Sequence, residues 1–418
     1  MTQAAALFIG FAATFAVWTG VSGFVVVNRM LHDRRERQLL VIARALADPA
    51  VASLGALGPS PAIRRILSRL SRRAVYRMVG NTALPVSVTE VCAAYTIERW
   101  GLPQMILDAS GDRRRGKWRR ISALFALGHI RAADSHDLLE RALFDPDRDI
   151  AGAAAVVLHR LGDERAAGIL VSALRGGSLP GSRIATHLDQ FPIPIHALLR
   201  PLLADPSNGT RYWAASLLSR YPEVDGLVGE IAALADDVDP QVRKAALATL
   251  GAIGSAAVIP AMERGVRDPV AYVRSTAIRS LARHGVLESD TSQRRIFAAA
   301  IAPFLSDIAF EVRLAAKESL VELGTVTWRE TAAELESKDE FARNGAAEVL
   351  QNLGLLDRAI AEIGNGIKPD DDLLDMLTRA LHAGGQPMVE AAGARSSPHV
   401  SPGVEALLAN LRSVGVDL

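Results

Sequence analysis

Residues 237–254, DVDPQVRKAALATLGAIG, decide the fold because their pattern recurs along the chain. Residues 268–285 read DPVAYVRSTAIRSLARHG, and residues 307–324 read DIAFEVRLAAKESLVELG. In each copy an acidic residue precedes an Arg by six positions, and Ala, Leu and Gly follow that Arg at +3, +7 and +11. Self-similarity at a period of about 30 residues is the signature of a repeat architecture.

Other copies of this pattern are less complete. Arg343 lacks the acid, which Ser337 replaces, and Arg211 lacks the Gly, which Pro222 replaces. Fainter copies surround Glu90, Lys117, Ala151, Arg183 and Val404, and Pro192 and Pro194 interrupt the copy around Arg183. The position equivalent to Arg243 recurs every 28 to 39 residues; it falls at 117, 151, 183, 211, 243, 274, 313 and 343. We expect roughly nine to eleven units from about residue 85 to the C-terminus.

Each copy has the pattern of a helical hairpin. An Asp-Pro pair is suited to a helix start, because Asp accepts free amide hydrogens there and Pro fits the first turn. Ala and Leu at +3 and +7 share one helix face, and Gly at +11 can take the left-handed conformation that ends a helix. The apolar residues 257–262 would form the partner helix. The predicted fold is therefore all-α, a right-handed superhelical solenoid in which neighbouring hairpins bury each other's apolar faces.

These residues resemble the HEAT-repeat family, and particularly its short bacterial version, the phycobilisome-lyase-like HEAT repeat. The resemblance covers about residues 105 to 360 well and the flanks loosely. It implies a helical solenoid with binding surfaces along its faces. It implies no activity, because the repeat motif belongs to the fold.

Composition agrees with closely packed helices. Of 418 residues, 49% are apolar but only 5% are aromatic, so small and aliphatic side chains provide most of the burial. The single cysteine, Cys92, excludes an intramolecular disulfide framework, and we interpret it as a small apolar residue inside a helix.

The N-terminus begins with an uncharged apolar segment. Residues 4–27 read AAALFIGFAATFAVWTGVSGFVVV, and about 24 helical residues span ~36 Å, enough to cross a hydrocarbon core of ~30 Å. The alternative is a cleaved signal peptide, which usually has a basic start and a shorter apolar core. We predict a short N-terminus (residues 1–3), a transmembrane helix (4–28), basic juxtamembrane or capping helices (29–85) and the solenoid (86–418).

Charge is distributed unevenly along the chain. Residues 1–120 hold 18 Lys and Arg against 7 Asp and Glu, a net charge of +11, and the remainder has a net charge of −10. By the positive-inside tendency, the basic residues after the apolar segment lie in the cytoplasm. We therefore expect a single-pass protein of the inner membrane, with its N-terminus outside and its solenoid in the cytoplasm.

Residues 63–78 have apolar residues at helical spacing, with arginines at the positions between them. Ile63, Leu67, Leu70, Ala74 and Met78 form the stripe. Such a basic amphipathic helix could lie on an anionic membrane surface, or it could cap the first repeat while its arginines are solvated. The candidate membrane-surface residues are Arg34, Arg35, Arg37, Arg64, Arg65, Arg69, Arg72 and Arg73.

Two sets of cations are candidate sites. The repeat arginines could form a structural ladder, each bridging to an acid such as Asp205, Asp237, Asp268 or Asp307, or they could line a functional groove; they are Arg211, Arg243, Arg274, Arg313 and Arg343. The second set could hold phosphates, anionic lipid or an acidic protein segment, or be the solvated start of a helix with one buried Trp. It comprises Arg113, Arg114, Arg115, Lys117, Trp118, Arg119 and Arg120.

Motifs of catalysis and cofactor binding are absent from the sequence. The nine histidines form no His-x-x-x-His or HExxH pair, and although His129 and His136 lie at a helical spacing of seven, no acid or Cys completes a ligand set. No phosphate-binding loop or nucleophile turn occurs. We expect no enzyme activity, metal or cofactor. The sequence favours a scaffold for an inner-membrane protein partner, such as an envelope-polysaccharide glycosyltransferase or a signalling receptor. The alternatives are an accessory lyase that handles a chromophore, and a nucleic-acid-binding protein.

Overall fold

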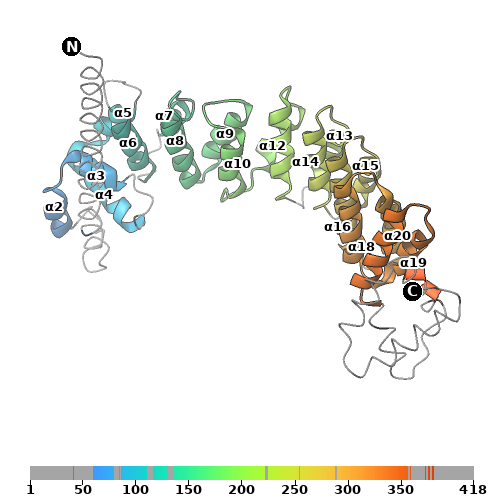
Figure 1. Ribbon diagram of the computed structural model, residues 1–418. Coiled ribbons are helices and arrows are strands. Elements are labelled where there is room, and N and C mark those ends of the chain that lie inside the picture. Colours follow the sequence, from blue (N-terminus) through green and yellow to red (C-terminus); the bar gives the residue numbers. More distant parts are fainter. Residues whose placement is uncertain are drawn as a thin grey trace, which may run out of the picture. The chain divides into compact units, whose positions relative to one another are not determined.

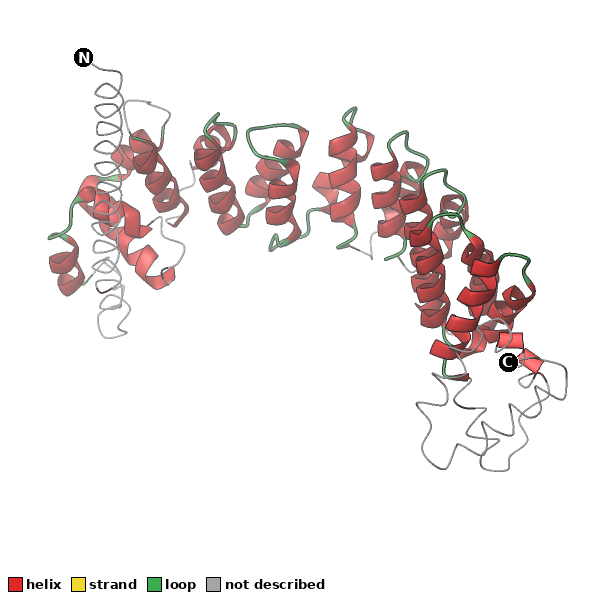
Figure 2. Ribbon diagram, viewed as in Figure 1, coloured by secondary structure: helices red, strands yellow, loops and turns green. Residues whose placement is uncertain are grey.

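The computed structural model describes residues 60–79, 84, 86–110, 116–129, 135–221, 225–253, 255–287 and 290–355, with single positions elsewhere. The predicted transmembrane helix (4–28) lies outside these residues, as do Arg34, Arg35 and Arg37. In the part of the chain that is described, every regular element is a helix (Figure 2). None of the described helices combines the length and the apolar character that crossing a membrane requires.

The chain divides into two compact units, Met1–Ile193 and Pro194–Leu418. The repeat pattern does not predict a boundary here, although Pro192 and Pro194 interrupt the repeat at this point. The helices of the first unit are α2 (Pro61–Leu67), α3 (Arg72–Val79), α4 (Val86–Trp100), α5 (Leu102–Ala109), α6 (Lys117–His129), α7 (Ser135–Leu143), α8 (Arg148–Leu161), α9 (Glu164–Ser172), the 3₁₀ helix η1 (Ala173–Arg175) and α10 (Gly181–Asp189).

The second unit continues the same alternation of longer and shorter helices (Figure 1). Its elements are α11 (His196–Leu199), η2 (Arg200–Ala204), α12 (Asn208–Leu218), η3 (Asp225–Leu227), α13 (Val228–Leu234), α14 (Pro240–Leu250), η4 (Ala256–Val258), α15 (Ile259–Gly265), α16 (Ala271–Leu287), α17 (Thr291–Ile301), η5 (Ala302–Ser306), α18 (Phe310–Leu323), η6 (Thr325–Thr327), α19 (Trp328–Ala332), η7 (Ala333–Glu336) and α20 (Glu340–Asn352).

Each unit is built from two layers of helices. In the second unit the helices that carry the repeat arginines contact one another in sequence order, α12 on α14, α14 on α16, α16 on α18 and α18 on α20. The helices α13, α15, α17 and α19 pack against them as the other layer. The first unit repeats this plan with α4, α6, α8 and α10 against α5, α7 and α9. The predicted all-α repeat of helical hairpins is confirmed for the described residues.

The repeated Ala and Leu residues are buried in the helices that carry the repeat arginines. Ala246 and Leu250 of α14 are fully buried, and so are Ala316 and Leu320 of α18. Ala at +3 lets adjacent helices approach closely, and Leu at +7 fills the space one turn further along the same face. The sequence register therefore predicted the core of these helices.

The Asp-Pro pairs start helices in two different ways. Asp239 caps α14 as expected, because its side chain accepts the amide of Gln241 at 2.7 Å and Pro240 opens the helix. At Asp268, however, the helix begins only at Ala271, and the carboxylate accepts the amide of Val270 at 2.8 Å. The expectation that Asp-Pro directly opens each helix is wrong there, since this Asp closes a turn that precedes the helix.

The glycines at +11 mostly end their helices as expected. Gly162, Gly324 and Gly354 have positive φ values of 65°, 89° and 72°, which favour glycine. Gly285 is different, because α16 continues through it to Leu287. A Cβ atom at Gly285 would lie 2.6 Å from the side chain of Leu323, so this glycine permits close approach of α18 rather than ending a helix.

Residues 61–79 cap the first unit. The single amphipathic helix expected over residues 63–78 is wrong, because two helices, α2 and α3, are separated by a turn at Ser68–Ser71. Ile63, Leu67 and Met78 of the predicted stripe are fully buried. Because α2 contacts α4, and α3 contacts α4 and α6, the apolar stripe is covered by protein. The structure therefore favours the capping interpretation over a membrane-lying helix.

Candidate functional site

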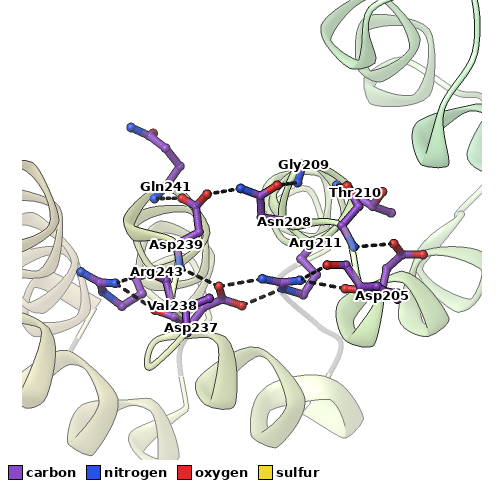
Figure 3. A network of polar contacts seen from close by, with 12 residues as sticks. Asp205, Asn208, Gly209, Thr210, Arg211, Asp237, Val238, Asp239, Gln241 and Arg243 are labelled. Atoms are coloured by element: carbon purple, nitrogen blue, oxygen red, sulfur yellow. Dashed lines mark hydrogen bonds and ion pairs between the residues drawn. The ribbon is translucent and has the colours of Figure 1, made fainter.

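The repeat arginines of the second unit link consecutive turns. Arg211, near the start of α12, donates through Nη1 to the carbonyl of Asp205 in its own turn, at 2.8 Å (Figure 3). Its Nε and Nη2 donate to the two carboxylate oxygens of Asp237 in the next repeat, at 2.7 and 2.9 Å. That carboxylate in turn accepts the amide of Asp239 at 2.9 Å. One guanidinium thus fixes two turns at once.

Two further rungs have the same geometry. Arg243 binds Asp268 at 2.7 and 2.9 Å, and Arg274 binds Asp307 at 2.9 and 2.8 Å. In all three rungs the arginine side chain is 13% exposed and the aspartate at most 9%. Two-point binding of a carboxylate by a mostly buried guanidinium is a strong, directional contact. The structure thus shows the ladder that the register predicts at Arg211, Arg243 and Arg274.

The ladder aspartates have lowered pKa values. For Asp237 the largest effect is burial, which by itself favours the protonated form. The hydrogen bonds from Arg211 and from the amide of Asp239, together with the positive charges of Arg211 and Arg243, outweigh it, so the pKa lies below its ordinary value of 3.8. The pKa values of Asp268 and Asp307 are lowered in the same way by Arg243 and Arg274. All three carboxylates are therefore charged at neutral pH.

A fourth rung lies in the first unit, where the sequence register was wrong by three residues. The amide of Arg120 donates to Gly116, four residues back, as the amide of Arg243 donates to Asp239. Nη2 of Arg120 donates to Asp145 in the next repeat at 2.6 Å. Arg120, and not Lys117, is therefore the ladder residue of α6. The signal that could have shown this is Ala and Leu at +3 and +7 from Arg120, at positions 123 and 127.

The described part of the predicted cationic cluster is paired with acids. Arg113, Arg114 and Arg115 lie outside the described residues. Lys117 lies 3.0 Å from Asp147 and also contacts Asp149, both at the start of α8. Arg119 lies 3.1 Å from a carboxylate oxygen of Asp108. Arg120 also binds an aspartate, so each of the three described cations contacts an acid on another helix or turn. The predicted anion site stays a prediction.

Trp118 is the exposed member of this cluster. Its side chain is 65% exposed, which contradicts the interpretation of a helix start with one buried Trp. Nζ of Lys117 lies 6.0 Å from the centre of its ring, at the limit of a cation–π contact. Trp118 therefore contributes apolar surface at the start of α6.

Asp108 was not predicted as an important residue, and it holds three helices together. Its buried carboxylate at the end of α5 accepts a hydrogen bond from the hydroxyl of Tyr76 at 3.0 Å and pairs with Arg72 and Arg119. Burial raises the pKa of Asp108, but the Tyr76 hydrogen bond and the two arginines together lower it by more. The net pKa is therefore below the ordinary value. Arg72 also lies 5.2 Å from the ring centre of Trp100.

These contacts correct the membrane-surface prediction in part. Arg72 belongs to the buried Asp108 cluster and is not free for a lipid surface. Arg64 pairs with Glu98 of α4 at 3.0 Å, with both side chains more than two-fifths exposed. Arg65 and Arg69 are exposed. The side chain of Arg73 lies outside the described residues.

The ladder stops at Arg313. Its Nη1 donates to the carbonyls of Asp307 and Ile308 at 2.8 and 3.1 Å, as the earlier rungs do in their own turns. Ser337 stands where the other rungs have Asp, and within the described residues Arg313 makes no ion pair. Its guanidinium lies 4.2 Å from the ring centre of Phe341. The ladder predicted through Arg313 is wrong at this rung.

Arg343 repeats the first half of this geometry. Its Nη1 donates to the carbonyls of Ser337 and Lys338 at 2.8 and 3.0 Å. The turn of the following repeat, where its acidic partner would stand, lies outside the described residues. The predicted rung at Arg343 therefore stays a prediction.

Exposed apolar side chains lie beside the ladder. We call the turns that precede the repeat arginines of the second unit, together with the first helical turn, the ladder edge; it comprises residues 205–211, 237–243, 268–274, 307–313 and 337–343. Four apolar side chains on it are well exposed: Val238 (90%), Ile308 (93%), Phe310 (65%) and Phe341 (58%). The ladder edge is thus a surface with exposed apolar groups, and rungs hold its turns at Asp237, Asp268 and Asp307.

Residues 195–282 match the family model of HEAT repeats. These residues lie in the second unit and include the rungs of Arg211, Arg243 and Arg274. A search of curated proteins found no match.

The solved structures that resemble the chain share little of its sequence. One is the crystal structure of an engineered protein, with 16% identity, 90% of this chain and 98% of that chain covered, and a TM-score of 0.36. Another comes from the structure that describes Kap95p binding to RanGDP, with 10% identity, 90% of this chain and 60% of that chain covered, and a TM-score of 0.47.

Within the described residues no group of three or more His, Cys, Asp or Glu side chains is placed to hold a metal ion. Cys92 is fully buried in α4, and burial raises the pKa of its thiol to about 12. A thiol that remains protonated and covered is a poor nucleophile, in agreement with its interpretation as a small apolar residue.

Proposed function

We propose that the protein is a scaffold that binds a protein partner along the ladder edge of its second unit. The observation that carries this proposal is the exposure of Val238, Ile308, Phe310 and Phe341 on the ladder edge, where complete rungs hold the turns of the first three. Large apolar side chains are rarely left exposed together unless a partner covers them. Because the turns are fixed before binding, little conformational entropy is lost when a partner docks.

The proposal includes a membrane anchor at residues 4–28. Its support is the uncharged apolar segment and the basic residues that follow it. In this arrangement the N-terminus lies outside and the repeats lie in the cytoplasm at the inner membrane. The exposed Arg65 and Arg69 are the described residues that can face an anionic surface. The proposed partner is a protein of the same membrane, such as a glycosyltransferase of envelope polysaccharide or a signalling receptor.

Site-specific photocrosslinking of the full-length protein in cells tests the scaffold proposal. The photoreactive p-benzoyl-phenylalanine replaces Val238, Ile308, Phe310 or Phe341 in turn, and matched controls place it at Arg283 and Glu322. These control residues are exposed near the C-terminal ends of α16 and α18, far along each helix from the ladder edge. We expect a specific adduct from the edge positions and none from the controls. Equal labelling at both sets, or no adduct from any edge position, contradicts the proposal.

Membrane extraction tests the anchor separately. We expect the full-length chain to stay in the membrane fraction at alkaline pH and to require detergent for release. A variant without residues 4–28 should enter the soluble fraction. A full-length chain that alkaline buffer releases contradicts an anchor but leaves the binding proposal open.

The alternative functions have weaker support. Nucleic-acid binding depended on the cationic cluster, and its described members Lys117, Arg119 and Arg120 are paired with aspartates. No observation on the described residues favours a role as an accessory lyase.

A further inference from the structure

The three complete rungs of the second unit define a fork that binds carboxylate. In each of them, Nη1 of the arginine is held by two carbonyls of its own turn, which orients the guanidinium. The Nε–Nη2 edge then faces the next repeat and receives both oxygens of an aspartate at 2.7 to 2.9 Å. The geometry of the fork is therefore set by the turn and is independent of the acid.

Arg313 keeps this orientation without the acid. Nη1 donates to the carbonyls of Asp307 and Ile308 at 2.8 and 3.1 Å, as in the complete rungs. Ser337 occupies the position of the missing aspartate, and its hydroxyl accepts the amide of Asp339 at 3.2 Å, which preserves the turn. The substitution removes the carboxylate but not the turn that carried it. The Nε–Nη2 edge of Arg313 is thus left without a carboxylate inside the described residues.

Aromatic side chains surround the open fork. Phe341 lies against the guanidinium of Arg313, with 4.2 Å from its ring centre to Cζ, and Phe310 lies 5.9 Å away on the same measure. At an earlier junction the position of Phe310 is taken by Asn208, whose side chain binds Asp239 of the next repeat. At this junction, therefore, the ladder edge lacks both of these polar links, and exposed rings lie beside a guanidinium that has no acidic partner among the described residues.

We infer that the fork of Arg313 binds one carboxylate group of a protein partner, from an Asp or Glu whose neighbours in the partner are apolar. The partner carboxylate takes the place that Asp237, Asp268 and Asp307 take in the other rungs. Its apolar neighbours cover Ile308, Phe310 and Phe341. This inference rests on the proposed scaffold function and specifies the chemistry of the contact.

The charge of the chain limits how acidic that partner segment can be. Residues 121–418 carry a net charge of −10, and Glu311 and Glu340 stand on either side of the fork in sequence. A segment with many acids is repelled by this surface, whereas one carboxylate that reaches the fork gains a two-point, charge-assisted contact. Binding of the partner segment therefore depends on the geometry of Arg313 and the aromatic rings. Long-range electrostatic attraction between the partner and this surface contributes little.

The first experiment tests the fork without any partner. Ser337→Asp in the full-length protein in detergent should complete the rung, and Ser337→Asn is the matched control, because Asn can accept the Asp339 amide but carries no charge. We expect Ser337→Asp to have a higher melting temperature than Ser337→Asn at pH 7. An equal or lower melting temperature shows that the fork does not receive a carboxylate, and it overturns the inference.

The second experiment tests the partner contact. With p-benzoyl-phenylalanine in place of Ile308, we expect Ser337→Asp and Arg313→Gln each to reduce the partner adduct about tenfold, and Ser337→Asn to leave it unchanged. Mass spectrometry should place the crosslink beside an Asp or Glu. Replacing that acid with Lys should abolish the adduct, and combining it with Arg313→Glu should restore it.

The outcomes separate the inference from the proposed function. An adduct that forms equally well with Ser337→Asp, or a crosslinked segment without a carboxylate, overturns the inference while the scaffold proposal stands. Adducts at Val238 but none at Ile308, Phe310 or Phe341 likewise overturn the inference and leave the scaffold proposal standing. No adduct from any of the four edge positions overturns both.

Discussion

Arg243 shows why single residues of the ladder matter for stability. It lies between two repeats, and its five-donor side chain serves carbonyls on one side and the carboxylate of Asp268 on the other. Both partners are mostly buried, with 13% and 8% of their side chains exposed. Removing one partner of such a pair leaves the other charge buried without compensation, which costs more than the pair contributes as a whole.

We expect Arg243→Gln to lower stability by about 2–3 kcal/mol, because the buried Asp268 carboxylate loses both guanidinium hydrogen bonds and two carbonyls lose their donor. Arg279→Gln is the matched control. Arg279 pairs with Glu318 at 3.1 Å, but the two side chains are 47% and 56% exposed, so its loss should cost less than about 0.5 kcal/mol. Thermal unfolding followed by circular dichroism measures both. Equal losses for the two variants contradict a structural role of the ladder.

The lowered pKa of Asp268 predicts acid sensitivity. Because the folded-state pKa lies below the ordinary value of 3.8, the contribution of Asp268 to stability is complete above about pH 4 and is lost as the pH falls through the folded-state pKa. Asp268→Asn has no such proton to gain. We expect this variant to be less stable than the natural protein at pH 6, but to lose less melting temperature between pH 6 and pH 3. Parallel melting curves for the two proteins contradict the assignment.

At the scale of the helix, small residues set how closely neighbouring elements approach. Gly265, at the end of α15, is buried, and a Cβ atom there would lie 2.8 Å from Leu247 and 2.9 Å from Ala277. Gly229, in α13, has no atom within 4 Å of the same position. The same residue type thus serves close packing in one helix and has no packing role in another.

These two glycines give a matched pair of substitutions. Gly265→Ala should destabilise the protein by about 1–3 kcal/mol, because the new methyl group overlaps side chains of α14 and α16. Gly229→Ala should stabilise it by about 0.5–1 kcal/mol, because alanine restricts the unfolded chain and favours the helix. Thermal unfolding of the two variants against the natural protein tests this. A stabilising Gly265→Ala would show that the helices are packed less closely than described.

At the scale of the whole molecule, the array has mainly neighbour-to-neighbour contacts. Described helices contact the elements of their own and the adjoining repeats. In such an array the stability of a region depends on its own repeats and their nearest interfaces. A local defect should therefore loosen the repeats around it and leave distant repeats unchanged.

Hydrogen exchange of the full-length protein tests this locality. Arg120→Gln breaks the rung to Asp145 and should increase exchange in α5–α8, with no change in α16–α20. Arg243→Gln should increase exchange in α12–α16 and leave α4–α8 unchanged. An increase throughout the chain in either variant shows cooperative unfolding of the whole molecule and contradicts the expectation.

Much of the fold was predictable from the sequence, because the repeat places the same residue types at the same helical positions. Ala and Leu at +3 and +7 from Arg243 and Arg313 indicated the buried faces, and the acid six residues before each Arg indicated the ladder. These features are local in the chain and repeat many times, so chance agreement is small. The repeat register was predicted wrongly at Lys117, because the cations at 117, 119 and 120 lie close together and each could have been the repeat arginine. The backbone hydrogen bonds of α6 identify Arg120 as the equivalent residue.

The tertiary structure alone decided which cations have partners. The sequence determined a helical repeat with an acid and an arginine in register, because periodicity is a property of the chain itself. It did not show that Arg72 and Arg119 share the buried Asp108, since those three residues meet only when α3, α5 and α6 pack together. Nor did it show that Arg313 keeps its orientation while its acid is missing, because that fork is built by carbonyls of a turn and by an aromatic ring from the next repeat.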